Sequence, residues 1–280
     1  MVCDRRSARP GGGRSMTWIA AYLVSGAFVG FLAGLIGIGG GMTLVPILSA
    51  LFSAQGLAPG YSVHLALGTA MASTLFTSFS SVREHHRLGS VDWQIVRRMV
   101  PGLMFGSLVS TGAAGWLSQG TLAILFALIA SAGATQMLRA SRPVAARPLP
   151  GPLPLFAWMS AIGATCGLVS AGGAFLTVPF MVYCGIPMRN AIGSGAAMAW
   201  PIAVIGTVGY VISGWPAMAG LPDYALGFVL LPVLAVLVAA SMLAAPFGAR
   251  LTHRLPTLVL KRIFAVVLYL VALKMATAYW

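Results

Sequence analysis

Two glycine clusters, each followed by a short apolar segment, are the residues of this chain best suited to bind a ligand. Gly39–Gly41 precedes the apolar segment 41–54, and Gly172–Gly173 precedes the segment 174–185. A helix of about 12 residues rises only ~18 Å, whereas the hydrocarbon core of a bilayer is ~30 Å thick. Glycine can end one helix and begin another inside the membrane, and a helix N-terminus presents N–H groups and partial positive charge. The two clusters therefore predict a small-anion site built from backbone N–H groups.

The candidate site also includes side chains near the clusters. We expect backbone donors at six positions and hydroxyl groups at four, namely Gly39, Gly40, Gly41, Gly172, Gly173 and Ala174, with Thr43, Thr69, Thr177 and Ser194. Pro46 and Pro179 are expected to shape the two short helices. Glycine can instead serve only close helix packing, which is our interpretation of Gly26, Gly30 and Gly34. For Thr69 and Ser194, facing the carbonyl groups of a neighbouring helix fits the sequence equally well.

The chain offers no pattern for catalysis or for a metal. Cys3, Cys166 and Cys184 have neither zinc-site spacing nor the number of a disulfide framework. Adjacent residues lack ligand spacing, so we expect Glu84–His86 to lie in a solvated loop. All four acidic residues are expected in tails or loops, which leaves no carboxylate inside the membrane to carry a proton. We therefore expect a protein that is not an enzyme and that has no catalytic residue, metal or cofactor.

Composition places the chain in a membrane. Of its 280 residues, 59% are hydrophobic and only 8% are charged. The stretch from Ser15 to Val82 is 68 residues without Asp, Glu, Lys or Arg, which is enough for about three spans of ~20 residues. The net charge of +13 comes from basic residues in short connections, as the positive-inside rule produces, so we do not expect nucleic-acid binding. The fold class predicted is an all-α polytopic membrane protein.

The apolar segments indicate an internal duplication. We expect five in each half, at 17–37, 41–54, 63–82, 95–117 and 120–139, and then at 155–170, 174–185, 190–213, 224–249 and 256–278. Gly30–Pro46 aligns with Gly163–Pro179 at an offset of 133, and seven of 17 residues are identical. Downstream, Ala66–Thr69 resembles Ala191–Ser194. Repetition of both motifs in the same order indicates two copies of one unit.

These copies define the expected organisation of the chain. Residues 16–140 form the first repeat, 141–154 a cytoplasmic linker rich in Pro and Arg, and 155–280 the second repeat. Residues 1–15 are interpreted as a disordered basic tail, with Met16 as an alternative true start.

Basic residues predict how the repeats are oriented. They concentrate in four connections, at Arg83, Arg87, Arg97 and Arg98, at Arg139, Arg142 and Arg147, at Arg189, and at Arg250, Arg254, Lys261 and Arg262. All four connections lie on one side if the first two segments of each half return to the side from which they entered. The two halves are then oppositely oriented, as inverted repeats, each opening with a glycine-broken hairpin of short helices. The arginines of the tail are the exception to this arrangement.

At the glycine motif the chain resembles the TauE/SafE sulfite-exporter family of bacterial membrane permeases. The resemblance rests on Gly30-x-x-x-Gly34-x-x-Gly37-x-Gly39-Gly40-Gly41-x-x-x-x-Pro46, on its second copy ending in Gly172-Gly173-Ala174 and Pro179, and on the two helix starts Ala66-x-Gly-Thr and Ala191-x-Gly-Ser. The second copy departs from the pattern at Ser170 and Ala174, which match Gly37 and Gly41. The resemblance implies about eight spans, duplicated halves and export of sulfite or an organosulfonate.

We therefore expect a multi-pass permease of the bacterial inner membrane that exports a small anion by alternating access around a site at mid-membrane. Its expected partners are the anionic substrate, membrane lipid and a second copy in a homo-oligomer. Arg97 and Arg98 are expected either to bind lipid headgroups or to lie in the interface. Two alternatives remain open at this point. One is an anion channel on the same scaffold, and the other is a membrane assembly factor or anchor without transport.

Overall fold

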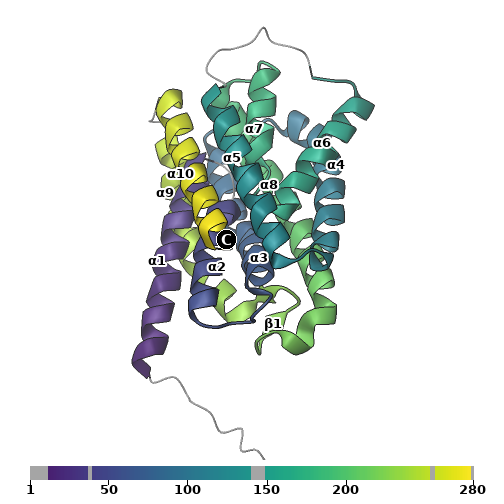
Figure 1. The fold of residues 1–280 in the computed structure, drawn as a ribbon. Coiled ribbons are helices and arrows are strands. Elements are labelled where there is room, and N and C mark those ends of the chain that lie inside the picture. Colours follow the sequence, from purple (N-terminus) through teal and green to yellow (C-terminus); the bar gives the residue numbers. More distant parts are fainter. Residues whose placement is uncertain (1–11, 37–39, 140–148, 253–255, 279–280) are drawn as a thin grey trace, which may run out of the picture.

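The computed structural model describes residues 12–36, 40–139, 149–252 and 256–278, which are almost entirely helical (Figure 1). The first half forms α1 Gly12–Ile36, α2 Gly41–Ala54, α3 Ser62–Arg87, α4 Trp93–Ala113, the 3-10 helix η1 Ala114–Trp116 and α5 Gln119–Arg139. The second half forms α6 Pro152–Leu168, α7 Ala174–Tyr183, α8 Met188–Gly214, the 3-10 helix η2 Trp215–Gly220, β1 Ala225–Leu226, β2 Val229–Leu230, α9 Leu231–Thr252 and α10 Thr257–Ala278. Each expected apolar segment corresponds to one of these α-helices.

The expected apolar segment 224–249 is not helical throughout. The residues before α9, expected to be part of the apolar segment 224–249, form the two-stranded antiparallel hairpin β1–β2, in which Ala225 pairs with Leu230. The reversal occurs at Gly227, whose φ is +54°, a conformation that glycine adopts without the steric cost other residues incur. Helix α9 consequently begins at Leu231.

Two helix ends also differ from expectation. Helix α1 begins at Gly12, so the last four residues of the tail expected to be disordered are helical, while residues 1–11 lie outside the described part of the chain. Helix α3 continues to Arg87, five residues beyond the expected end of its apolar segment. Most of the linker 141–154 also lies outside the described residues.

The helices have the lengths and compositions of a multi-pass membrane protein. Four described helices are long and apolar enough to cross a bilayer, namely Met16–Leu35, Ser62–Arg87, Met188–Gly220 and Leu231–Leu251. Shorter apolar helices are Gly41–Ala54, Gln119–Thr135, Pro152–Leu168 and Ala265–Ala276. A chain with several such helices is a polytopic membrane protein.

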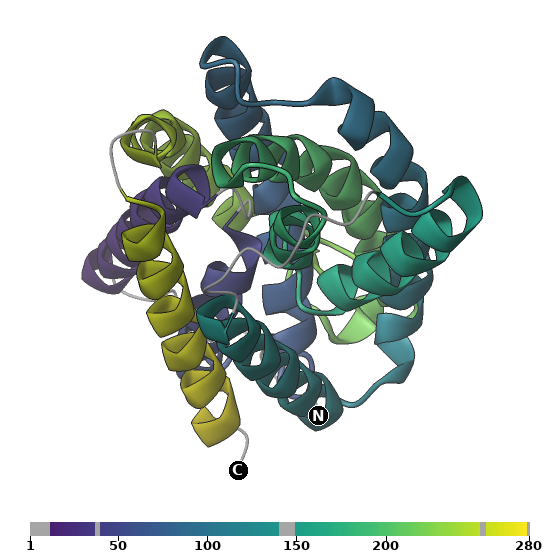
Figure 2. The same ribbon diagram turned by 90° about the horizontal axis from the view of Figure 1, so that it is seen from above.

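Equivalent helices of the two halves make equivalent contacts. Helix α1 packs on α9 and α6 packs on α4, so the first helix of each half lies against the fourth helix of the other half. Likewise α3 packs on α9 and α8 on α4, while α3 contacts α8 and α5 contacts α10. In the view from above, α1 and α9 lie on one side of the bundle and α6 on the opposite side (Figure 2). In each half, the first and third helices therefore pack on the fourth helix of the other half.

Small residues bring these helices into backbone contact. Gly26, Gly30 and Gly34 lie on the face of α1 that contacts α9, and a Cβ on Gly34 would overlap the carbonyl oxygen of Ala245. Their packing role is thereby confirmed, since no larger residue fits at this separation. In the same way Gly106 on α4 lies against the backbone of α6.

Candidate functional site

Helix α2 begins inside the bundle at the first glycine cluster. Gly40 is its N-cap residue and has φ = +81°, a left-handed conformation in which any other residue would be strained. Gly41 is the first residue of the helix, and both glycines are buried. Helix geometry leaves the first N–H groups of α2 without an acceptor in their own helix. Gly39, also predicted in the site, lies outside the described residues.

Helix α7 begins in the same way at the second cluster. Gly173 is its N-cap residue and Ala174 its first residue, and Gly172, Gly173 and Ala174 are all buried. The side chain of Ile202 in α8 lies against Gly173, and Ala174 packs against Gly195 of the same helix. The two predicted short helices are thus confirmed as helices whose N-termini lie within the protein interior.

The hydroxyl groups of the two predicted threonines bind the N-cap carbonyl groups. Thr43 Oγ1 donates to the Gly40 carbonyl oxygen at 2.8 Å, and Thr177 Oγ1 donates to that of Gly173 at 2.6 Å. Both threonines are buried. In this conformation each hydroxyl proton stabilises the glycine turn, which differs from the role as a ligand donor expected from sequence.

The two helix breaks meet at Gly41 and Ser170. A Cβ on Gly41 would overlap the Ser170 carbonyl oxygen and approach Thr74 Oγ1 of α3. Ser170 is fully buried with φ = +50°, and its Oγ donates to the carbonyl oxygen of Leu67 in α3 at 2.7 Å. A non-glycine residue with positive φ is strained and persists only where its surroundings hold it. Sequence reasoning missed Ser170 as a site residue, although its match to Gly37 in the first copy was the available signal.

Pro46 and Pro179 occupy equivalent positions inside the two short helices. Each is the sixth residue of its helix, α2 or α7. Proline lacks a backbone N–H and its ring displaces the carbonyl group four residues earlier, so it bends a helix. Their predicted role in shaping these helices is consistent with this placement.

Thr69 and Ser194 anchor the residues that precede α9 and α4. The backbone N–H of Leu230 donates to Thr69 Oγ1 at 3.0 Å, and that of Asp92 donates to Ser194 Oγ at 2.9 Å. Leu230 directly precedes α9, and Asp92 is the N-cap residue of α4. The repeated Ala-x-Gly-Thr/Ser motif thus supports helix starts in both halves, and both hydroxyl groups accept from backbone N–H groups instead of facing carbonyl groups of a neighbouring helix. The role of Thr69 and Ser194 as site residues stays a prediction.

The glycine of the same motif brings the backbones close enough for these hydrogen bonds. A Cβ on Gly68 would overlap the carbonyl group of Phe228, and one on Gly193 would overlap that of Ser90. Both halves therefore use a glycine for close approach and the next hydroxyl for the hydrogen bond. The described contacts do not bring Thr69 and Ser194 together with the glycine clusters.

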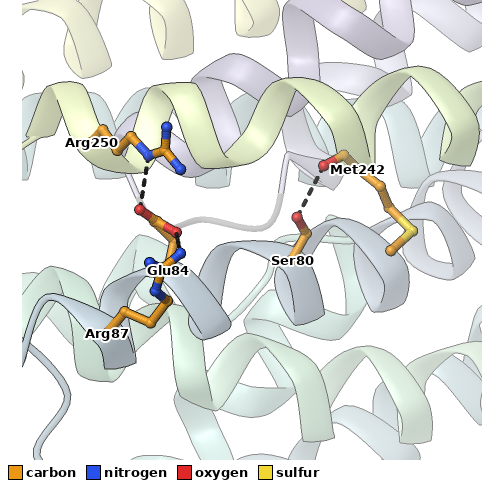
Figure 3. A network of polar contacts seen from close by, with 5 residues as sticks. All are labelled: Ser80, Glu84, Arg87, Met242 and Arg250. Carbon is orange, nitrogen blue, oxygen red and sulfur yellow. Dashed lines mark hydrogen bonds and ion pairs between the residues drawn. The ribbon is translucent and has the colours of Figure 1, made fainter.

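Glu84 and His85 are buried, so the prediction of a solvated loop is wrong. Both lie in the last turn of α3, with exposed fractions of 8% and 0%. Glu84 Oε1 accepts from Arg250 Nε of α9 at 2.9 Å, and Glu84 Oε2 lies 3.5 Å from Arg87 Nη1 (Figure 3). Nearby, Ser80 Oγ donates to the Met242 carbonyl oxygen at 3.0 Å. The placement of Glu84 in a loop is corrected with it, because Glu84 is part of a helix and Arg250 supplies the counter-charge that burial requires.

His85 and Tyr210 contact equivalent carbonyl groups in the two halves. His85 Nε2 lies 3.3 Å from the Gly34 carbonyl oxygen near the end of α1, and its Nδ1 lies 3.2 Å from Ser90 Oγ. Tyr210 Oη donates to the Gly167 carbonyl oxygen near the end of α6 at 3.0 Å. Both side chains are fully buried. Each therefore supports the helix that ends just before a glycine break, where the last carbonyl groups lack partners in their own helix.

Known proteins resemble this chain over almost its whole length. Residues 22–275 match the family model described as sulfite exporter TauE/SafE. A probable membrane transporter protein of Haemophilus influenzae is 34% identical over 263 residues, which are 92% of this chain and 98% of the relative. The probable membrane transporter protein YdhB of Bacillus subtilis is 25% identical, over 83% of this chain and 90% of the relative. No solved structure matches at a significant level.

Proposed function

Because the chain belongs to the TauE/SafE sulfite exporter family, we propose that it is a permease that exports a small anion, sulfite or an organosulfonate, across the bacterial inner membrane by alternating access. The proposal is carried by one observation, the contact between the two helix breaks at Gly41 and Ser170. The family model and the names of the relatives support transport in general terms. The anion and the mechanism are our proposal.

The proposed anion site is built from the N-termini of α2 and α7. Its proposed donors are the N–H groups of Gly39–Gly41 and Gly172–Ala174. At the first residues of α2 and α7, helix geometry directs the N–H groups toward the helix breaks. Two partly positive helix ends near one another can hold an anion without a full positive charge. Thr43 and Thr177 hold the N-cap turns, while Thr69 and Ser194 hold the starts of α9 and α4. These four hydroxyl groups position the site in this proposal.

We place these elements in two inverted repeats with about eight membrane-spanning helices. The exchange of helix contacts between the halves supports this arrangement. Helix α1 begins at the lower end of the view and α6 at the upper end (Figure 1). Equivalent helices that start at opposite ends are what an inverted repeat requires.

The orientation follows from the basic residues. Arg87 and Arg250 lie together at one end of the bundle around Glu84, and the positive-inside rule assigns such an end to the cytoplasm. An inside-negative potential then favours exit of an anion by ~2.3 kcal/mol per charge per 100 mV. Export driven by this potential needs no bound metal or cofactor.

Flux in proteoliposomes tests this function. Purified protein would be reconstituted, and tracer efflux of sulfite, sulfoacetate, sulfate, thiosulfate and chloride would be measured with and without an imposed inside-negative potential. We expect saturable efflux of one sulfur-containing anion, accelerated by the potential and showing counterflow. Efflux without saturation or counterflow would favour an anion channel. Absence of flux for every anion, from folded protein, would contradict the permease proposal and favour a role in assembly or anchoring.

A further inference from the structure

A groove with a volume of about 590 Å³ lies between α3, α4 and α8. Phe79 of α3, Trp93 of α4 and Trp200 of α8 line it, with exposed fractions of 52%, 44% and 42%. These exposed aromatic side chains belong to helices of a membrane protein, so the groove faces the lipid phase. Its volume lies within the ~300–1,000 Å³ typical of ligand sites.

The groove is basic at one end and apolar along the rest. Among the described residues that line it, Arg97 is the one that carries a charge. Arg97 lies in the second turn of α4, four residues after Trp93, so the two side chains share a face of the helix. The groove continues past Val100 and Pro101 of α4, deeper along the bundle. Trp93 itself is held at the helix start, where its Nε1 donates to His86 Nδ1 at 3.2 Å.

We propose that this groove binds an anionic phospholipid, with one acyl chain along the apolar floor and the phosphate on Arg97. Guanidinium groups pair with phosphate through two parallel hydrogen bonds, and tryptophan is enriched at the level of lipid headgroups. A basic pocket between helices at the cytoplasmic side is the arrangement that recognises anionic headgroups. A free inorganic anion would leave the long apolar part of the groove unfilled.

The neighbouring Arg98 supplies a matched comparison for Arg97. Both side chains are exposed near the start of α4, but Arg98 does not line the groove. Successive residues of a helix point about 100° apart. A general attraction of basic residues to an anionic membrane would involve both arginines, whereas the proposed site requires Arg97. This proposal does not depend on which anion the protein transports.

Native mass spectrometry of the full chain tests the site. Wild type, Arg97→Gln and Arg98→Gln, delipidated in detergent, would each be titrated with phosphatidylglycerol and with phosphatidylcholine. We expect wild type and Arg98→Gln to retain phosphatidylglycerol in preference to phosphatidylcholine. Arg97→Gln should retain about fivefold less phosphatidylglycerol than wild type, which is the effect of one basic residue near a lipid headgroup. Equal losses in both variants, or no preference for phosphatidylglycerol in wild type, would overturn the proposal.

A second variant tests the acyl chain. Val100→Trp fills the groove at a partly exposed position and should weaken retention of both lipids while Arg97 is intact. If Val100→Trp retains phosphatidylglycerol as wild type does, or if inorganic phosphate alone displaces the lipid completely, the groove does not hold a chain and the proposal fails. Loss of a dimer rather than of lipid in Val100→Trp would instead identify a second copy as the occupant. The Arg97 and Arg98 comparison decides the headgroup contact even if Val100→Trp does not fold.

Discussion

The hydroxyl oxygen of Thr69 in α3 accepts a hydrogen bond at 3.0 Å from the backbone N–H of Leu230, 161 residues further along the chain. Ser194 in α8 does the same for Asp92 at 2.9 Å. Each hydroxyl thus connects a central helix to the start of a helix from the other half. These two bonds fix where α9 and α4 begin, and with them the frame that holds the two glycine breaks.

Removal of either hydroxyl should destabilise the fold. In Thr69→Val the buried N–H group of Leu230 loses its acceptor, and a buried unpaired donor costs about 1–3 kcal/mol. In Ser194→Ala the loss should be smaller, because the N–H group of Asp92 is only partly buried. Thr207→Val is the matched control, because Thr207 Oγ1 is buried without a hydrogen-bond partner in the described structure. Unfolding in detergent should show a lower unfolding midpoint than wild type for the first two variants and an unchanged midpoint for the control. Equal midpoints in all three would contradict the anchoring role.

The ion pair between Glu84 and Arg250 should couple α3 to α9 energetically. A double-mutant cycle with Glu84→Ala and Arg250→Ala should give a coupling energy of about 1 kcal/mol, limited by the exposure of Arg250. Arg87→Ala should change stability by less than about 0.5 kcal/mol, because its 3.5 Å contact is long and the arginine is 68% exposed. A coupling energy near zero would mean that the short contact to Arg250 contributes nothing.

Labelling of Cys184 should report the proposed orientation. Cys184 follows α7 in the connection to α8 and is partly exposed, whereas Cys166 is fully buried. In a Cys3→Ser background, an impermeant maleimide should modify Cys184 in inside-out vesicles and not in right-side-out vesicles. Burial raises the pKa of the Cys184 thiol, so the rate should increase about tenfold from pH 7 to pH 8, as the thiolate fraction does below the pKa. Labelling only in right-side-out vesicles would show that Cys184 faces the outside, so that the proposed orientation is wrong.

Local patterns predicted much of the architecture. The bounds of α2 and α7 followed from glycine clusters that precede short apolar runs, and the family followed from the motif ending at Pro46. The paired motifs at Gly68–Thr69 and Gly193–Ser194 also marked equivalent positions correctly. These features depend on residues close in sequence, or on repetition, both of which are visible without a structure.

Long-range partners account for what sequence reasoning missed. Glu84 looked like a loop residue because its counter-charge, Arg250, lies 166 residues away. The β1–β2 hairpin interrupts an apolar segment because Leu230 is held by the distant Thr69. Ser170 gave only a weak signal, since its strained conformation and its contact with Gly41 depend on how the two halves meet.

Binding of the transported anion to Gly41→Ala tests the central claim most directly. The added methyl group would displace the Ser170 carbonyl group and separate the two helix breaks. Gly112→Ala is the control, because nothing lies within 4 Å of a Cβ at that position. For the anion identified by flux, calorimetric titration should give the same affinity for wild type and Gly112→Ala, and an affinity at least about tenfold weaker, or ~1.4 kcal/mol, for folded Gly41→Ala. Wild-type affinity in folded Gly41→Ala would contradict an anion site where the two helix breaks meet at Gly41 and Ser170.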